Sequence, residues 1–121
     1  MNFDEFLKAY LICALWSSTD DAGNPLDDNY SVDDVSEELR TSSTEECRDF
    51  FDANAELLTI ALEKFAFGSS SAGNDFWLTR NGHGAGFWDR GLGEVGERLS
   101  EASKVYGGVD LYVGDDGKIY G

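Results

Sequence analysis

Apolar residues recur at helical spacing in the opening stretch NFDEFLKAYLICALW. The positions that fall on one stripe are Phe3, Phe6, Leu7, Tyr10, Leu11, Ala14 and Leu15. A stripe of this kind buries one face of a helix against a core. The pattern therefore predicts an N-terminal helix, which the polar residues 17–19 bring to an end.

A polar stretch, TDDAGNPLDDNYSVDD, follows and predicts a loop that ends in a short helix, VDDVSEELR. Ser31 with Asp34 has the composition of a helix N-cap. The next stretch, TSSTEECRDFFDANAELLTIALEKF, predicts the strongest helix of the chain, and Ser42 with Glu45 has capping-box spacing. Its apolar positions are Cys47, Phe50, Phe51, Leu58, Ala61, Leu62 and Phe65.

The stretch GSSSAGN has the composition of a flexible connector, and after it the predicted elements change from helices to strands. DFWLTR has strand composition, NG is a hairpin-turn signal, and GAGFWDR provides a returning strand. GEVGERLSEASKVYG predicts a helix, and VDLYVGDDGKIYG predicts a second hairpin around residues 114–117.

These elements predict a single α+β domain over residues 1–121, with N-terminal helices followed by β-β-α-β-β. Residues 1–66 would form an acidic helical half, and residues 74–121 a hairpin-helix-hairpin half. The strands would make an antiparallel sheet with helices packed on one face. Strand register would turn Phe76, Leu78, Leu111 and Val113 toward those helices.

The net charge of the chain disfavours some classes of binding partner. The chain has 24 acidic and 9 basic residues, a formal net charge of -15. Residues 1–64 carry 16 acids and 4 bases (net -12), and residues 65–121 carry 8 acids and 5 bases (net -3). Such a field repels nucleic-acid phosphates and anionic membranes and attracts basic proteins. We therefore expect a basic protein partner and no direct contact with nucleic acid or membrane.

Cys13 and Cys47 each lie within an apolar helical pattern, which predicts buried, reduced thiols. The apolar run AYLICALW is too short to span a bilayer and follows acidic residues where a secretion signal would be basic. These features lead us to expect a cytoplasmic location.

The only histidine, His83, offers limited chemistry. Zinc would need His83 with Cys13 and Cys47, which lack ligand spacing. NGHGAG lacks the Gly-Lys-Ser/Thr ending of a P-loop, and no acidic stretch has the order of ligands of a calcium-binding EF-hand loop. We expect no metal and no cofactor.

The stretch DFWLTRNGHGAGFWDR, residues 75–90, contains two of the three tryptophans, the only histidine and two arginines. We interpret it as a hairpin with a recognition surface on its outer face. Tryptophan and arginine are typical of binding hot spots. The candidate partner-binding residues are Trp77, Arg80, Asn81, His83, Trp88 and Arg90, together with the aspartate pairs Asp20, Asp21, Asp27, Asp28, Asp33 and Asp34. The alternative is that the tryptophans are core residues and the arginines pair with Asp75 and Asp89.

The phrase FWLTRNGHGAGFWDR, with ALWSSTDDAGNPLD before it and LYVGDDGKIY after it, resembles a family of small acidic bacteriophage proteins of no settled activity. The resemblance runs from about Ala14 to Tyr120. It implies a phage protein in bacterial cytoplasm that acts on host or phage machinery, and it supplies no catalytic residues. Small acidic phage proteins include anti-CRISPR, anti-restriction and glycosylase-inhibitor proteins, an analogy of size and charge.

Three functional hypotheses remain open at this stage. The first is a non-enzymatic inhibitor or modulator that binds a host nucleic-acid-handling or defence protein, as a DNA mimic does. The second is a small enzyme or ligand-binding protein centred on His83, Asp75, Asp89 and Arg90. The third is a homo-oligomeric accessory phage protein.

Overall fold

The computed structural model describes residues 1–121 and consists mainly of helices. The helices are α1 (Phe3–Ser17), α2 (Glu37–Ala53), α3 (Ala55–Phe65), α4 (Ser69–Arg80) and α5 (Glu94–Lys104). Three short 3-10 turns, η1 (Leu26–Asp28), η2 (Val32–Asp34) and η3 (Phe87–Asp89), lie between them. The only sheet pairs β1 (Tyr112–Val113) with β2 (Ile119–Tyr120) in antiparallel orientation.

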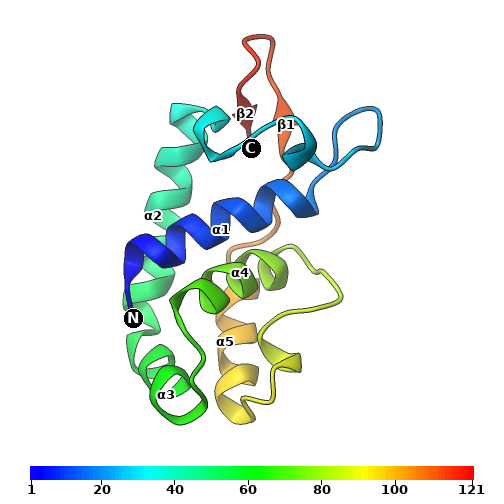
Figure 1. Ribbon diagram of the computed structural model, residues 1–121. Helices are drawn as coiled ribbons and strands as arrows, with labels where there is room; N and C mark the ends of the chain where they lie inside the picture. The colour runs from blue at the N-terminus through cyan, green and yellow to red at the C-terminus, as the bar shows by residue number, and fades with distance from the viewer.

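Helix α1 crosses the middle of the molecule (Figure 1). Helices α4 and α5 lie on one side of it, and the η1–η2 segment and the β-hairpin lie on the other. The larger core unites α1, α2, α3, α4 and α5 around Phe6, Phe50 and Phe76. A smaller core joins Leu15 to Leu26, Val35, Leu39 and Ile119, and thereby fixes η1, the start of α2 and the hairpin to the end of α1.

The predicted α+β fold is wrong, because residues 69–80 form one helix instead of a connector and a strand. From Asp75 to Arg80 every side chain is buried, so this half of the helix has no exposed polar face that would reveal the helical period, and its residues have the composition of a strand. Tertiary packing here overrides the weak helix propensity of serine, glycine and asparagine. The order β-β-α-β-β is therefore replaced by helices with one short hairpin at the C-terminus.

The Asn81-Gly82 dipeptide ends helix α4 and does not form a hairpin turn. The Gly82 amide donates to the Thr79 carbonyl (3.2 Å), and the His83 amide donates to the Leu78 carbonyl (3.0 Å). This is the hydrogen-bond pattern of a Schellman cap. Gly82 has φ +70. A hairpin turn and a Schellman cap both require positive φ at this glycine, so the Asn-Gly dipeptide alone does not distinguish a turn from a helix end.

The boundaries of the acidic helices also differ from the prediction. Helix α2 begins after Ser36, whose hydroxyl accepts from the Leu39 amide (3.0 Å). Ser42 lies inside the helix and donates to the Leu39 carbonyl, so the predicted capping box at Ser42 is wrong. The predicted continuous helix is divided at Asn54 into α2 and α3. The N-terminal helix, the helix at 94–104 and the hairpin at 112–120 are present as predicted.

Gly73 allows α4 to lie directly against α1. A β-carbon added at this position would lie 2.0 Å from the carbonyl oxygen of Phe6. No side chain larger than hydrogen fits such a contact, and α1 packs more extensively against α4 than any other pair of elements does. The small residues that resemble a linker in the sequence are therefore the contact surface between the two central helices.

We expect Gly73→Ala to lower the free energy of unfolding by about 3 kcal/mol, because the two helices must move apart to accept the methyl group. The measurement is thermal unfolding followed by circular dichroism. Gly84→Ala is the matched control, since a methyl group there meets nothing within 4 Å. Equal stability of the two variants would contradict the close crossing.

Candidate partner-binding surface

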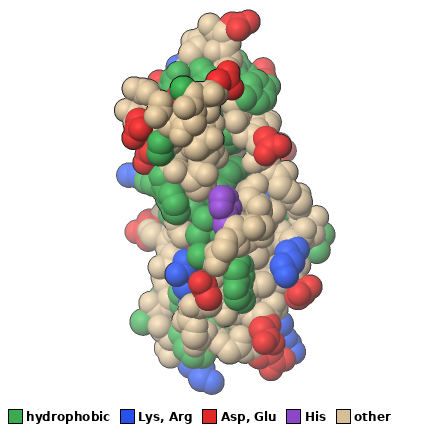
Figure 2. All heavy atoms as spheres, turned by 90° about the vertical axis from the view of Figure 1, so that its right-hand side faces the viewer, with side chains coloured by type: hydrophobic (Ala, Val, Ile, Leu, Met, Phe, Trp, Pro, Cys, Tyr) green, Lys and Arg blue, Asp and Glu red, His purple; other side chains and the backbone are tan.

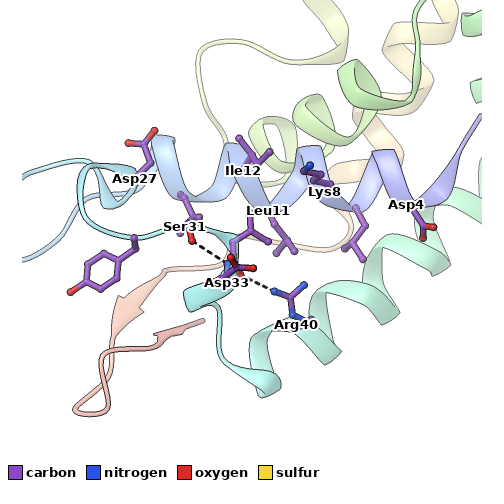
Figure 3. Close-up of a pocket in the computed structure, with 12 residues that line it drawn as sticks. Asp4, Lys8, Leu11, Ile12, Asp27, Ser31, Asp33 and Arg40 are labelled. Atoms are coloured by element: carbon purple, nitrogen blue, oxygen red, sulfur yellow. Dashed lines mark hydrogen bonds between the residues drawn. The ribbon is translucent and has the colours of Figure 1, made fainter.

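A groove of about 640 Å³ runs along the side of α1 that faces away from α4 (Figure 3). Helix α1 contributes Leu7, Leu11, Ile12 and Leu15 to its floor, and residues 30–33 form the opposite wall. The charged residues that line it are Asp4, Lys8, Asp27, Asp33 and Arg40. The groove thus combines an apolar floor with charged residues around its rim.

The six aspartates predicted to bind a partner do not have equal roles. Two of them hold the backbone in place. One Asp20 carboxylate oxygen accepts from the amides of Ala22 and Asn24 (both 2.9 Å), and the Asp34 carboxylate accepts from the Ser31 amide (2.8 Å). These bonds fold the 18–34 segment into defined turns.

The remaining four aspartates are exposed. Asp27 and Asp33 line the groove, and Asp21 and Asp28 lie outside it. None of these four carboxylates accepts a hydrogen bond or forms an ion pair within the chain (Ser31 Oγ accepts from the backbone amide of Asp33, 3.3 Å). They are therefore available to a partner.

The 75–90 stretch is mainly internal. Trp77 is 2% exposed and its indole Nε1 donates to the Ser17 hydroxyl (2.7 Å), so it belongs to the core. Asn81 also acts within the fold: its side chain donates to the Trp77 carbonyl and accepts from the Val109 amide (2.7 Å). Trp88, in contrast, is 45% exposed. The alternative that places tryptophan in the core holds for Trp77 and not for Trp88.

Arg80 joins four parts of the chain from a buried position. Its guanidinium donates to the Tyr10 hydroxyl (3.0 Å), to the Glu46 carboxylate and to the carbonyls of Tyr106 (3.0 Å) and Gly107 (2.8 Å). It thereby links α1, α2 and α4 to the end of α5. Each of its three guanidinium nitrogens donates within the chain and the side chain is buried, so Arg80 is structural and is not exposed to a binding partner.

Arg90 covers the buried carboxylate of Asp75. The Arg90 Nε and Nη2 atoms donate to the two carboxylate oxygens at 3.0 and 2.9 Å, and Asp89 lies 3.7 Å from Arg90 Nε. The hydrogen bonds to Asp75 raise the pKa of Arg90. The pairing of Arg90 with Asp75 and Asp89 that the alternative describes is thus present, whereas Arg80 pairs with Glu46.

Asp75 and Arg90 also line a second, more polar cleft of about 910 Å³ between α1 and α4, where Ser70, Ser71 and Asn74 lie. His83 does not line this cleft. Its ring forms no hydrogen bond or ion pair with Asp75, Asp89 or Arg90. Figure 2 shows the histidine at the surface of the molecule, with acidic side chains toward both ends of that face. The structure therefore does not assemble the four residues of a His83-centred site.

Both cysteines are buried and free, as the sequence predicts. Burial raises the pKa of Cys13 to about 12, and the negative charge of Asp75 adds to this effect. Burial likewise raises the pKa of Cys47. No group of three or more His, Cys, Asp or Glu side chains has an arrangement that could hold a metal ion. No helix combines the length and apolar character needed to cross a membrane.

The groove contains residues that the sequence analysis did not single out as binding residues, including Asp4, Lys8, Ile12, Tyr30 and Arg40. One signal was available. Ile12 and Trp16 lie off the predicted core stripe and are 44% and 45% exposed, so α1 is apolar on more sides than the core requires. The contribution of Arg40 depends on tertiary structure and has no local signal.

Comparison with known proteins adds no relative: no family model matches the chain, and no curated protein or solved structure is significantly similar to it.

We expect Arg80→Leu to lower the free energy of unfolding by about 3–5 kcal/mol, because Glu46, Tyr10 and two carbonyls lose their shared donor. The control is Arg98→Leu, which removes an exposed pair with Glu94 and should cost about 0.5 kcal/mol or less. Urea unfolding measures both. Similar midpoints for the two variants would contradict the role of Arg80.

We also expect stability to fall in alkaline solution. The pKa of Cys13 rises from its ordinary value of 9.0 to about 12 in the folded chain, and that of Cys47 is raised as well. The unfolded thiols therefore lose protons at a lower pH than the folded ones, so their contribution is complete below about pH 8 and is lost as the pH rises above that value.

The measurement is the free energy of unfolding at neutral pH and at successive alkaline values, for the natural chain and a Cys13→Ala/Cys47→Ala variant. The variant should be less stable at neutral pH but lose less stability on alkalinisation. An identical alkaline slope in the two proteins would show that these thiols do not carry the effect.

Proposed function

We propose that this protein acts without catalysis, by binding a basic protein that handles nucleic acid, and that it inhibits or modulates that protein. The observation that supports this most directly is the groove on α1. There an apolar floor, open to solvent at Ile12 and in part at Leu7, is bordered by the carboxylates of Asp27 and Asp33, which have no partner within the chain. Apolar contact surrounded by unpaired charge suits a protein partner of opposite charge.

The net charge of -15 extends this attraction beyond the groove. Long-range charge raises the rate of association with a partner of opposite sign and disfavours nucleic acid itself. A basic groove that normally binds phosphates would accept this protein in their place, which is the action of a DNA mimic. The resemblance to small acidic phage proteins is consistent with an anti-defence role in bacterial cytoplasm, and both belong to the proposal.

A His83-centred enzyme is less well supported. Arg90 and Asp75 are tied to each other by two hydrogen bonds, and the His83 ring is not joined to them. An enzyme would need these groups to face a common substrate.

The test is capture of a partner from bacterial lysate on the immobilised protein, at about 0.1 M and at about 1 M salt. Attraction between exposed charges is screened over about 10 Å at 0.1 M salt and about 3 Å at 1 M. We therefore expect a basic nucleic-acid-binding partner whose affinity falls at least about tenfold over this range. Double-stranded DNA should compete with the protein for that partner.

An Asp27→Asn/Asp33→Asn variant should weaken the salt dependence more than Glu56→Gln/Glu63→Gln, which removes the same charge from α3. Neither pair of side chains forms an ion pair within the chain. The absence of any partner at either salt concentration, or an affinity that does not change with salt, would contradict the proposal.

A further inference from the structure

Helix α1 has two apolar faces, and the chain covers only one of them completely. Phe6, Tyr10, Cys13 and Ala14 are buried against the rest of the fold. Leu7, Leu11, Ile12 and Leu15 follow one another along the groove at spacings of four, one and three residues. Helices present such a stripe when they pack against another helix. Leu11 and Leu15 are buried by the rest of the chain, so the apolar side chains left open to a partner are Ile12, which is 44% exposed, and the half-buried Leu7.

The length of the groove suits a short helix. Its residues on α1 run from Asp4 to Leu15, which is a rise of about 17 Å in an α-helix. The opposite wall, from η2 and Arg40, stops short of covering Ile12, which is 44% exposed. Trp16, one turn farther along α1, is 45% exposed and extends the apolar surface beyond the groove.

Charge is divided along the groove (Figure 3). Asp27 lies by the C-terminal end of α1 and Asp33 on the opposite wall, whereas Lys8 and Arg40 lie nearer the N-terminal end. Lys8 forms no ion pair, and the guanidinium of Arg40 donates to the Val32 carbonyl (2.7 Å) but to no carboxylate. The end beside Leu15 is therefore acidic, and the middle carries unneutralised positive charge.

We propose that this groove binds one amphipathic helix of the basic partner. Apolar side chains of that helix pack on Leu7 and Ile12, and its basic end meets Asp27 and Asp33. Lys8 and Arg40 disfavour basic side chains in the middle of the groove, between Asp27 at one end and Asp4 at the other, so the basic residues of the bound helix are placed at its end. This inference rests on the proposed function and names the site at which the partner binds.

The probe is a fluorescein-labelled synthetic peptide of about 14 residues, made of leucine, alanine and lysine, with leucines at helical spacing and lysines at one end. A scrambled peptide of the same composition keeps the charge and loses the apolar stripe. Fluorescence anisotropy measures binding of both. We expect the amphipathic peptide to bind at least about tenfold more tightly than the scrambled one.

Ile12→Ser should weaken peptide binding about tenfold, while Ile60→Ser should leave it unchanged. Ile60 is a matched control for Ile12, since both isoleucines lie on helices and their exposed fractions are 37% and 44%. Likewise, Asp27→Lys/Asp33→Lys should weaken binding more than Glu56→Lys/Glu63→Lys, which makes the same change in net charge on α3.

Equal binding of the two peptides, or equal effects of Ile12→Ser and Ile60→Ser, would overturn the groove as the site. Light scattering that shows a dimer abolished by Ile12→Ser would also overturn it, because a second copy of the chain would then cover the groove.

The same variants separate this inference from the proposed function. A salt-sensitive partner that Ile12→Ser and Asp27→Lys/Asp33→Lys still capture in full would leave the proposed function standing and overturn the groove. A peptide that binds as expected, with no partner captured from lysate, would support the groove and contradict the proposed function.

Discussion

The close crossing of α1 and α4 at Gly73 is the contact on which the other elements depend. With Gly73 against the Phe6 carbonyl, α4 is close enough for Phe76 and Trp77 to pack on Tyr10, with ring centroids 5.4 and 5.3 Å apart. The same placement carries Arg80 to the centre of the molecule, where it hydrogen-bonds to residues from α1, α2 and the end of α5. The second half of α4, residues 75–80, is surrounded in this way and cannot also offer a binding surface, so it provides the framework of the fold.

The sequence predicted those elements whose amphipathic pattern is local. The helix at 94–104 shows this most clearly, because Leu99 is fully buried while Glu94 and Glu97 of its first turn are exposed. The hairpin at 112–120 was also predictable, since Gly117 has the positive φ that its turn requires. The pattern failed at α4, where every side chain after Asn74 is buried and no polar face exists to reveal the helical period.

The candidate site could be predicted only in its composition. The aspartate pairs were visible, but their division into residues that hold the backbone, such as Asp20, and residues that face the groove, such as Asp27, depends on turns that only the folded chain shows. The two tryptophans of the 75–90 stretch also have different environments, because α4 buries Trp77 while η3 exposes Trp88. Composition indicated a protein-binding role, and the fold moves its proposed location from that stretch to the far side of α1.

The most direct test of this account is amide hydrogen exchange, measured on the free protein and on its complex with the captured partner. Buried helices exchange through global unfolding, whereas exposed loops exchange quickly. The account predicts that residues 76–80 exchange most slowly in the free protein, and that the partner adds protection at residues 8–16 and 27–33. Rapid exchange of residues 76–80, with protection by the partner confined to residues 75–90, would contradict both the buried position of α4 and the assignment of the binding surface to α1.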